Sequence, residues 1–391
     1  MNAGLALLAF AYVLSQFFRA FLAVLSPFLQ SDLGATPQDL AFASGLWFIA
    51  FAALQPPIGW ALDTHGPRRT AAGLMLLGAG GGSAVFALAS SPLHISVAMT
   101  LIGVGCAPVL MASYYIFALD HPTDRFAFLA ALMVGIGTLG NLVASYPMTL
   151  AAETIGWRAA MWALCAASSA TALGILVLVR DPVKGPQTEV GSFAAVLRIR
   201  ALWFIFPLML VSYAEVGALR GLWIGPYLAE VFAAPPRVIG QASLAMGLAM
   251  VVGPMAYSAA DRIIPSRKWI IFGGSALLLI STLALIGAPD RSILYVAAIM
   301  CLIGFFGSTY PAIMAHGRSF LPPHLVGRGV TMLNLCSIGG VGIAQFATGR
   351  IYSGVDPAAG AVAPYWMILI FFAALLTLGL AVYLFSRDAP T

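Results

Sequence analysis

A succession of apolar runs, each about as long as a membrane-spanning helix, dominates this sequence. An α-helix crosses the hydrocarbon core of a bilayer in about 20 mostly apolar residues. The alternating segments of about 10 residues that a membrane β-barrel needs are absent. The sequence therefore predicts an all-α membrane protein with twelve transmembrane helices. Cutting the runs at proline, glycine and charge clusters places these helices at 5–28, 40–61, 70–90, 93–119, 126–150, 157–179, 201–230, 238–260, 268–288, 292–315, 329–351 and 364–385.

A shortage of charge supports the same conclusion. Charged residues make up 8% of the chain, whereas a soluble domain carries about 25%. This excludes a soluble enzyme, a nucleic-acid binder and a disordered protein. The four cysteines lie inside apolar runs without CxxC spacing, so neither a metal site nor a cofactor is expected. The glycine-rich run at 78–83 lacks the Lys-Ser/Thr of a phosphate-binding loop, and we expect it to pack helices together.

Lysine and arginine are distributed unevenly over the predicted loops. With the N-terminus in the cytoplasm, thirteen of the 19 lie on the cytoplasmic side, four on the outer side and two within spans. The positive-inside rule therefore predicts that both termini are cytoplasmic, and anionic lipid headgroups are natural partners of the net charge. The composition is arginine- and alanine-rich and shows no organelle signal, which favours a bacterial inner membrane. We expect a monomer.

A long polar stretch at 181–200 divides the chain into halves of six spans, 1–180 and 201–391. The loops after the second and eighth spans are alike, and their aspartates, Asp63 and Asp261, are 198 residues apart. A second pair of similar loops places Arg125 and Arg328 203 residues apart. Parallel repeats of six helices are a recognised plan of secondary transporters.

The loop after the second span carries the signature G-x-x-x-D-x-x-G-x-[RK]-[RK], filled by Gly59, Asp63, Gly66, Arg68 and Arg69. With this motif and its degenerate copy six helices later, the chain resembles the major facilitator superfamily. The resemblance covers nearly the whole chain and includes a weaker Gly-Trp-Arg element at 156–158. It implies two pseudo-symmetric six-helix halves that move a small solute by alternating access, and no enzymatic activity.

The resemblance also implies a latch on the cytoplasmic side in the outward-open state. Asp63 would face the start of the eleventh span, where a helix N-terminus stabilises a carboxylate, and Arg125 would be its charge-assisted partner. Asp261 with Arg328 would form the weaker twin. The alternative is that these charges only solvate loops and set topology. The members of the predicted latch are Gly59, Asp63, Arg68, Arg69, Arg125, Asp261 and Arg328.

Three ionisable side chains lie well inside predicted spans: Arg19, Glu215 and Arg220. Each costs at least about 2.5–3.5 kcal/mol to place at a bilayer centre, so each is a functional hypothesis. The arginines lie on equivalent spans of the two halves, and we expect both to reach one central cavity and bind anionic oxygens. For Arg220 the alternative is a side chain that extends to the outer interface.

Glu215 admits two interpretations. A carboxyl in an apolar cavity can carry a proton, or it can serve as a fixed counter-ion to Arg19. Further substrate-binding candidates are the isolated polar side chains Tyr114, Tyr213, Tyr310 and Asn334, although such residues also hold transmembrane helices together.

The predicted substrate is a small anionic or zwitterionic organic solute, such as a carboxylate, amino acid or short peptide, with protons as a candidate coupling ion. Two departures from family patterns bear on this. Met99 stands where many proton-coupled members have arginine, and Asn141 follows Gly140 where drug antiporters have proline. The alternatives are efflux of apolar or cationic compounds and a non-transporting sensor on a transporter scaffold.

Overall fold

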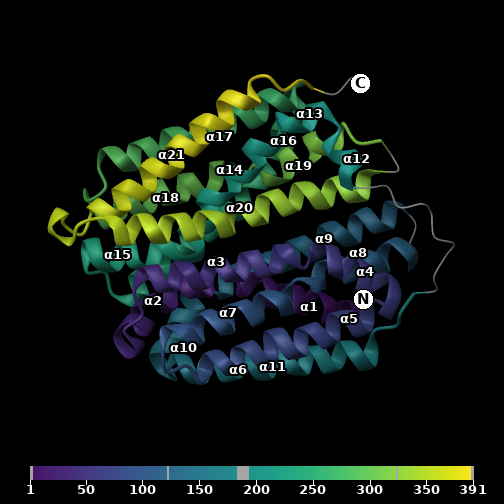
Figure 1. Cartoon of the computed structure of the whole chain (residues 1–391), viewed down its shortest axis with the longest axis horizontal. Coiled ribbons are helices and arrows are strands. Elements are labelled where there is room, and N and C mark those ends of the chain that lie inside the picture. The colour runs from purple at the N-terminus through teal and green to yellow at the C-terminus, as the bar shows by residue number, and fades with distance from the viewer. Residues whose placement is uncertain (1–2, 121–122, 183–192, 323–324, 389–391) are drawn as a thin grey trace. The chain divides into compact units, whose positions relative to one another are not determined.

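A computed structural model describes residues 3–120, 123–182, 193–322 and 325–388, without the side chains of 123–128, 131, 193 and 327. Within these residues every regular element is a helix (Figure 1). The chain divides into two compact units, Met1–Gln187 and Thr188–Thr391. Of the expected linker at 181–200, residues 183–192 lie outside the described part, and Phe193–Leu197 forms a short helix, α12.

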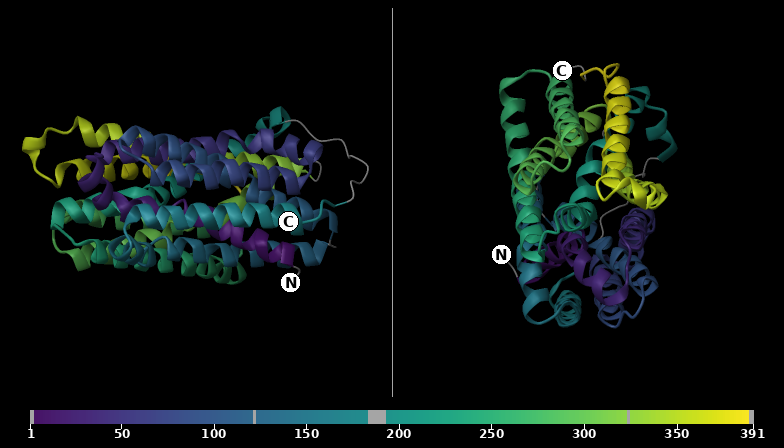
Figure 2. Two further views of the ribbon diagram at one scale, coloured as in Figure 1. Left: turned by 90° about the horizontal axis from the view of Figure 1, so that it is seen from below. Right: turned by 90° about the vertical axis from the view of Figure 1, so that its left-hand side faces the viewer.

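The first unit consists of helices that run beside one another (Figure 2). They are α1 (Ala3–Phe17), α2 (Phe21–Leu33), α3 (Pro37–Ala53), α4 (Gln55–His65), α5 (Pro67–Leu74), the π turn η1 (Met75–Gly80), α6 (Gly81–Ala87), α7 (Pro92–Cys106), α8 (Pro108–Asp120), α9 (Thr123–Val143), α10 (Tyr146–Thr154) and α11 (Trp157–Leu178). Their ends follow local chemistry. Thr36 and Asp39 form a reciprocal capping box at the start of α3, and proline occupies the first turn of several helices.

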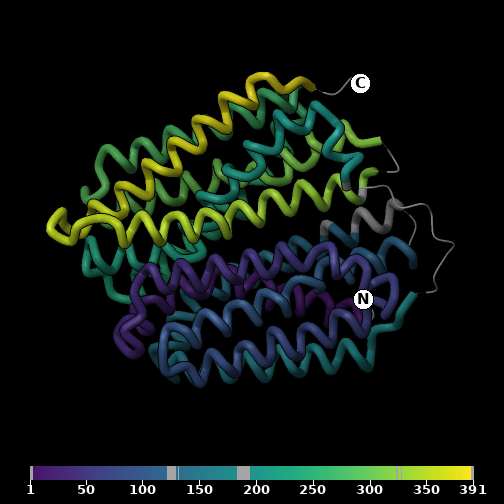
Figure 3. Tube along the Cα trace, in the orientation of Figure 1, coloured from purple at the N-terminus to yellow at the C-terminus, as the bar shows by residue number. Residues whose placement is uncertain are grey.

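The second unit repeats this plan with longer unbroken helices, and the trace in Figure 3 follows each of them along the unit. After α12 come α13 (Arg200–Trp203), α14 (Phe206–Ala218), the π turn η2 (Leu219–Trp223), α15 (Ile224–Phe232), α16 (Pro236–Ile263), α17 (Arg267–Gly287), α18 (Ile293–Phe306), α19 (Tyr310–Arg318), α20 (Val326–Gly354), the 3-10 turn η4 (Pro357–Ala359) and α21 (Ala363–Tyr383).

The spans expected from the sequence correspond to these helices or to pairs of them. Among the described residues, nine helices are long and apolar enough to cross a membrane, and two bent pairs, α1 with α2 and α3 with α4, raise the number to eleven. The 46° bend between α3 and α4 has a clear cause, since Pro56 and Pro57 lack the amide hydrogens that would continue the helix. The expected fifth span, 126–150, contributes a shorter apolar helix, Leu132–Val143, so the number twelve stays a prediction.

The outer faces of both units are apolar. Leu77, Val177 and Leu294 expose 73–81% of their surface, which suits contact with lipid tails. In the interior, glycines let the backbones of neighbouring helices approach closely. A Cβ on Gly78 of η1 would lie 2.4 Å from the Gly105 nitrogen of α7. The glycine-rich run therefore packs against a neighbouring helix, as expected from the sequence.

This close approach can be tested with a pair of glycine substitutions. A Cβ on Gly105 would lie 2.1 Å from the Ala79 nitrogen, a backbone atom that cannot move aside. Gly105→Ala is therefore expected to lower the free energy of unfolding by about 1–3 kcal/mol, the usual cost of overpacking. The measurement is thermal unfolding of the purified protein in detergent.

Gly73→Ala is the matched control. Gly73 is also helical, but a Cβ there meets no described atom within 4 Å. It should be neutral or stabilise by up to about 1 kcal/mol through helix propensity. Equal unfolding temperatures for Gly105→Ala and the wild type would contradict the packing described above.

Candidate functional site

Arg19 interrupts the first span. It lies in the turn between α1 and α2, where the chain bends by 50°. Its guanidinium carbon lies 4.9 Å from the ring centre of Phe51 and 5.6 Å from that of Trp47, both on α3, which is within cation–π range. Neither Arg19 Nε nor Trp47 Nε1 has a hydrogen-bond partner among the described residues. No described carboxylate forms an ion pair with Arg19.

Arg220 interrupts the seventh span in a different way. It belongs to the π turn η2, and π turns inside α-helices occur frequently at functional sites. The side chain is 3% exposed, so the alternative of a side chain extended to the outer surface is not adopted. Its guanidinium packs on Gly247 of α16, where a Cβ would lie 2.7 Å from a terminal nitrogen. Gly247 therefore makes room for the arginine.

Three of the predicted substrate-binding residues come together in the second unit. Tyr310 of α19 donates a hydrogen bond to Asn334 Oδ1 of α20 (2.8 Å), and its ring centre lies 6.0 Å from that of Tyr213 on α14. Tyr114 belongs to the first unit, on α8, near Tyr12 of α1. The second unit thus holds a cluster of hydroxyl and amide groups as well as an arginine.

Glu215 is 1% exposed on α14 and faces α17. Its Oε1 lies 2.6 Å from the Thr282 hydroxyl, and its Oε2 is buried without a hydrogen-bond partner among the described residues. Thr282 is the only polar partner that the described part of the chain gives this carboxyl. Among the described residues no cation bonds to Glu215, and Arg220, five residues further along the chain, is not its partner.

The loop signature is organised around a residue that the sequence analysis did not select. Asp181, just after α11, accepts a hydrogen bond from the Arg68 amide (2.9 Å) and lies 3.4 Å from its Nε. The carboxylate thus caps α5. Gly66 has φ +87°, and a Cβ there would lie 2.8 Å from Asp181 Oδ1, so this position suits glycine for both reasons.

The other residues of the predicted latch have various surroundings. Asp63 lies in the last turn of α4, exposed and near Tyr115 of α8. Arg69 is exposed, and a Cβ on Gly59 would meet nothing within 4 Å in its own half. The side chain of Arg125 lies outside the described residues.

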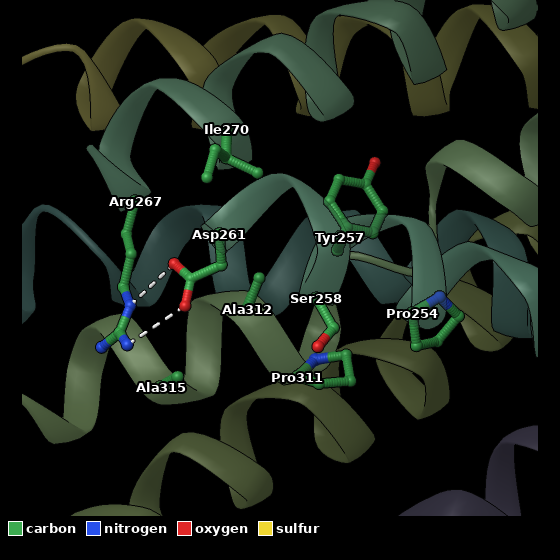
Figure 4. Close-up of a pocket in the computed structure, with 9 residues that line it drawn as sticks. All are labelled: Pro254, Tyr257, Ser258, Asp261, Arg267, Ile270, Pro311, Ala312 and Ala315. Atoms are coloured by element: carbon green, nitrogen blue, oxygen red, sulfur yellow. Dashed lines mark hydrogen bonds and ion pairs between the residues drawn. The ribbon is translucent and has the colours of Figure 1, made fainter. Parts of the chain in front are cut away.

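In this structure Asp261 accepts two hydrogen bonds from Arg267, of 3.0 and 3.2 Å (Figure 4). Its pairing with Arg328 in the outward-open latch stays a prediction. Asp261 and Arg267 lie in a cavity of about 210 Å³ between α16, α17 and α19. Arg267 begins α17 and is six residues from Asp261. The turn between α16 and α17 therefore brings the two side chains together.

A second carboxylate caps a helix at the same position of the repeat. Asp388, just after α21, accepts hydrogen bonds from the Ser266 hydroxyl and from the Lys268 amide (2.9 Å) at the start of α17. Burial alone would raise the pKa of Asp388, but these hydrogen bonds hold it below its ordinary value. His316 Nε2 lies 3.0 Å from the Arg387 carbonyl, and its Nδ1 lies 2.7 Å from the Tyr383 hydroxyl. The end of the chain is thereby fixed to α17 and α19.

The opposite ends of the helices carry one polar cluster in each unit. In the first, Asp32 accepts a hydrogen bond from Trp157 Nε1 (2.8 Å), and Arg158 lies 3.4 Å away. In the second, Glu230 Oε2 accepts hydrogen bonds from the hydroxyls of Tyr352 (2.7 Å) and Tyr365 (2.6 Å). Each cluster joins the ends of two or three spans.

The sequence matches a family model described as Major Facilitator Superfamily over residues 8–345. The chain belongs to the major facilitator superfamily. Similar solved folds include a bacterial homolog to the human lysosomal transporter Spinster, in an inward-facing and occupied conformation, with a TM-score of 0.76 and 17% identity over 99% of this chain and 98% of that one.

Two other superfamily structures are similar to the same extent. A D-xylose–proton symporter gives a TM-score of 0.76 and 14% identity over 99% of this chain and 98% of that chain. The nucleoside transporter NupG gives 0.73 and 14% over 98% and 99%. No curated protein matches the sequence. At these identities the likeness establishes the fold alone, and it is the family match that points to a transporter.

Sequence reasoning missed several residues of this superfamily member. Asp181 and Asp388 each follow an arginine just after the last helix of a unit, and this repeated Arg-Asp pair, 207 residues apart, was a usable signal. Thr282 carried no such signal, because threonine in an apolar helix is common. The described residues contain no group of three or more His, Cys, Asp or Glu that could hold a metal ion.

The capping role of Asp388 predicts a pH-dependent contribution to stability. Asp388→Asn should destabilise the protein by about 0.5–2 kcal/mol at neutral pH, as the loss of a helix cap does. Because the pKa of Asp388 is lowered by folding, its contribution is present above the ordinary Asp range. It is lost as the pH falls through the lowered value.

The measurement is thermal unfolding of the wild type and the variant over a pH series, in which the difference should shrink on acidification. Asp290→Asn is the control, since Asp290 is exposed and caps no helix. A difference that is constant with pH would contradict the role assigned to the carboxylate.

Proposed function

We propose that this superfamily member is a secondary active transporter that moves a small anionic or zwitterionic organic solute, such as a carboxylate, amino acid or short peptide, by alternating access. Each half contributes one arginine, on equivalent spans. The observation that carries the proposal is the state of Arg19, a half-buried cation for which no described carboxylate provides a counter-ion.

The surroundings of Arg19 support an anion rather than a structural ion pair. The faces of Trp47 and Phe51 hold the guanidinium in place, and cation–π contacts leave its N–H donors available to a ligand. The buried indole nitrogen of Trp47 is a further donor next to it that has no hydrogen-bond partner among the described residues. A carboxylate ligand can accept from several such donors at once, because each of its oxygens has two lone pairs.

We propose that residues of the second half bind the rest of the solute. Arg220 is buried in a π turn, and Tyr213, Tyr310 and Asn334 form a polar cluster on neighbouring helices of the same unit. Hydroxyl and amide groups can both donate and accept, so they suit an amino, hydroxyl or peptide group of a zwitterionic or polar solute. We propose that these four residues, with Tyr114 and Arg19, are the substrate-binding residues.

The cellular setting follows from charge and composition. We propose a bacterial inner membrane with both termini in the cytoplasm, because thirteen lysines and arginines fall on one side of the predicted spans and four on the other. We further propose that the protein works as a monomer, that Asp63 and its neighbours latch the cytoplasmic side, and that protons drive uptake as symport.

The arginine substitutions test this proposal directly. Arg19→Ala and Arg220→Ala should each weaken the apparent affinity for an anionic solute by roughly 10- to 150-fold, because a hydrogen bond to a charged group contributes about 1.5–3 kcal/mol. Arg19→Lys should lie between, since lysine keeps the charge and loses the bidentate geometry. The measurement is uptake into proteoliposomes of a panel of carboxylates, amino acids, dipeptides and cationic dyes.

Arg291→Ala is the matched control. Arg291 lies over Tyr295 at an exposed position, so its removal changes the net charge equally without touching either proposed binding residue. Dye transport that is unaffected by both arginine substitutions, without anion uptake, would overturn the proposal in favour of efflux of cationic compounds. The absence of any flux would favour a non-transporting protein.

A further inference from the structure

A buried carboxyl with a single hydroxyl partner lies in the interior of the second unit. Glu215 is 1% exposed, and Thr282 Oγ1 lies 2.6 Å from its Oε1. An ionised carboxylate in such surroundings needs a cation or several hydrogen bonds to offset the loss of water. The described part of the chain offers this carboxyl neither, since its other oxygen is buried without a hydrogen-bond partner.

The Thr282 hydroxyl can serve either protonation state of Glu215. This hydroxyl lies within hydrogen-bond distance of two oxygens, the Leu278 carbonyl (3.0 Å) and Glu215 Oε1 (2.6 Å). A hydroxyl has one hydrogen to donate, and a carbonyl oxygen can only accept. When Thr282 donates to the Glu215 carboxylate, its contact with Leu278 is no hydrogen bond. When Thr282 donates to Leu278, its oxygen can accept the hydrogen of a neutral Glu215, and both contacts are then hydrogen bonds.

The neighbouring helices supply no competing charge. Glu215 lies on α14, which packs against α13, α19, α20 and α21 and continues into η2. Thr282 lies on α17, which packs against α16, α18, α19 and α21. None of the titratable or charged groups on these elements bonds to Glu215 in the described structure. These groups are Arg200, Tyr213, Arg220, Arg237, Tyr257, Asp261, Arg262, Arg267, Lys268, Tyr295, Cys301, Tyr310, His316, Arg318, Arg328, Cys336, Arg350, Tyr352, Tyr365 and Tyr383.

Two further buried hydroxyls lie on the same two helices. Ser212 precedes Glu215 by one helical turn on α14, and Ser275 precedes Thr282 by two turns on α17. Both are 0% exposed, and neither oxygen has a hydrogen-bond partner among the described residues. Both lie nearer than the Glu215–Thr282 pair to the ends of the helices that we predict to be cytoplasmic. They lie on the two helices along which a proton from the cytoplasmic side would reach the pair.

We propose that Glu215 and Thr282 form the proton-binding site of the transport cycle, inside the second half and separate from Arg220, with Thr282 as its positioning residue. The inference rests on the proposed function and specifies its coupling group. When Glu215 releases its proton to water, the Thr282 hydrogen turns from the Leu278 carbonyl to the carboxylate. Thr282 therefore accepts from the acid and donates to its anion, and so serves both states.

The first test needs no substrate. If the folded protein holds a proton on Glu215 that the unfolded chain releases, folding binds a proton and stability falls as the pH rises. Wild-type protein should lose thermal stability as the pH rises above the ordinary Glu range of about 4–5, until Glu215 ionises in the folded state, and Glu215→Gln, which resembles the neutral acid, should lose less. Infrared spectra should show a neutral carboxyl stretch that Glu215→Gln lacks. An identical spectrum in that variant would overturn the inference.

The second test uses transport and tests the role of Thr282. Glu215→Gln should keep solute exchange in the absence of a pH gradient and lose gradient-driven accumulation. Thr282→Val should shift the pH midpoint of accumulation upward by roughly one unit or more, because the anion loses its only hydrogen-bond donor. Thr282→Ser should restore the midpoint. Ser281→Ala is the control, since Ser281 bonds only to the Leu277 carbonyl of its own helix.

The outcomes separate the two proposals. If wild-type liposomes accumulate no anion, the proposed function fails, while the infrared and stability measurements still decide whether Glu215 holds a proton. If accumulation in Glu215→Gln follows the pH gradient as in the wild type, the transporter stands and the coupling role of Glu215 is overturned. An unchanged midpoint in Thr282→Val would overturn the positioning role.

Discussion

The cost of placing charge away from water determines how this protein is organised. A helix bundle with apolar outer faces can hold an ionisable side chain only where the interior provides a partner, and each buried charge here is handled differently. Arg19 lies on the faces of two aromatic rings. Arg220 is accommodated by Gly247, which makes room for its guanidinium. Glu215 is paired with a hydroxyl, an arrangement that suits the neutral acid.

Surface carboxylates use the same principle at the helix ends. Asp181 and Asp388 accept hydrogen bonds from backbone amides in the first turns of α5 and α17, where a negative charge is favourable. Each is supplied by the segment after the last helix of its unit, so the final helix is fixed to the third span of that unit. The two halves therefore use the same kind of helix cap at equivalent positions.

Much of the fold could be predicted from the sequence because hydropathy records burial in lipid directly. The helical class follows from apolar length, and the family follows from the loop signature after the second span. The rarity of charge within the spans singles out Arg19, Glu215 and Arg220 as candidates, and their roles stay predictions. The partner of Asp261 could not be predicted, since choosing between Arg267 and Arg328 depends on the turn before α17. The contact between Thr282 and Glu215 could not be predicted either. It joins residues 67 positions apart, and no sequence pattern indicates it.

The π turn around Arg220 also bears on how the seventh span tolerates changes in length. A π turn accommodates one residue more than the α-turn it replaces, so the residues beyond it keep the orientation they would have in a regular helix one residue shorter. Deleting one residue from 219–223 would therefore restore a regular helix and leave Tyr227 and Glu230 facing Tyr352 and Tyr365 as before. What such a deletion would disturb is the place of Arg220 against Gly247. The extra residue of the seventh span thus serves the arginine and not the helix beyond it.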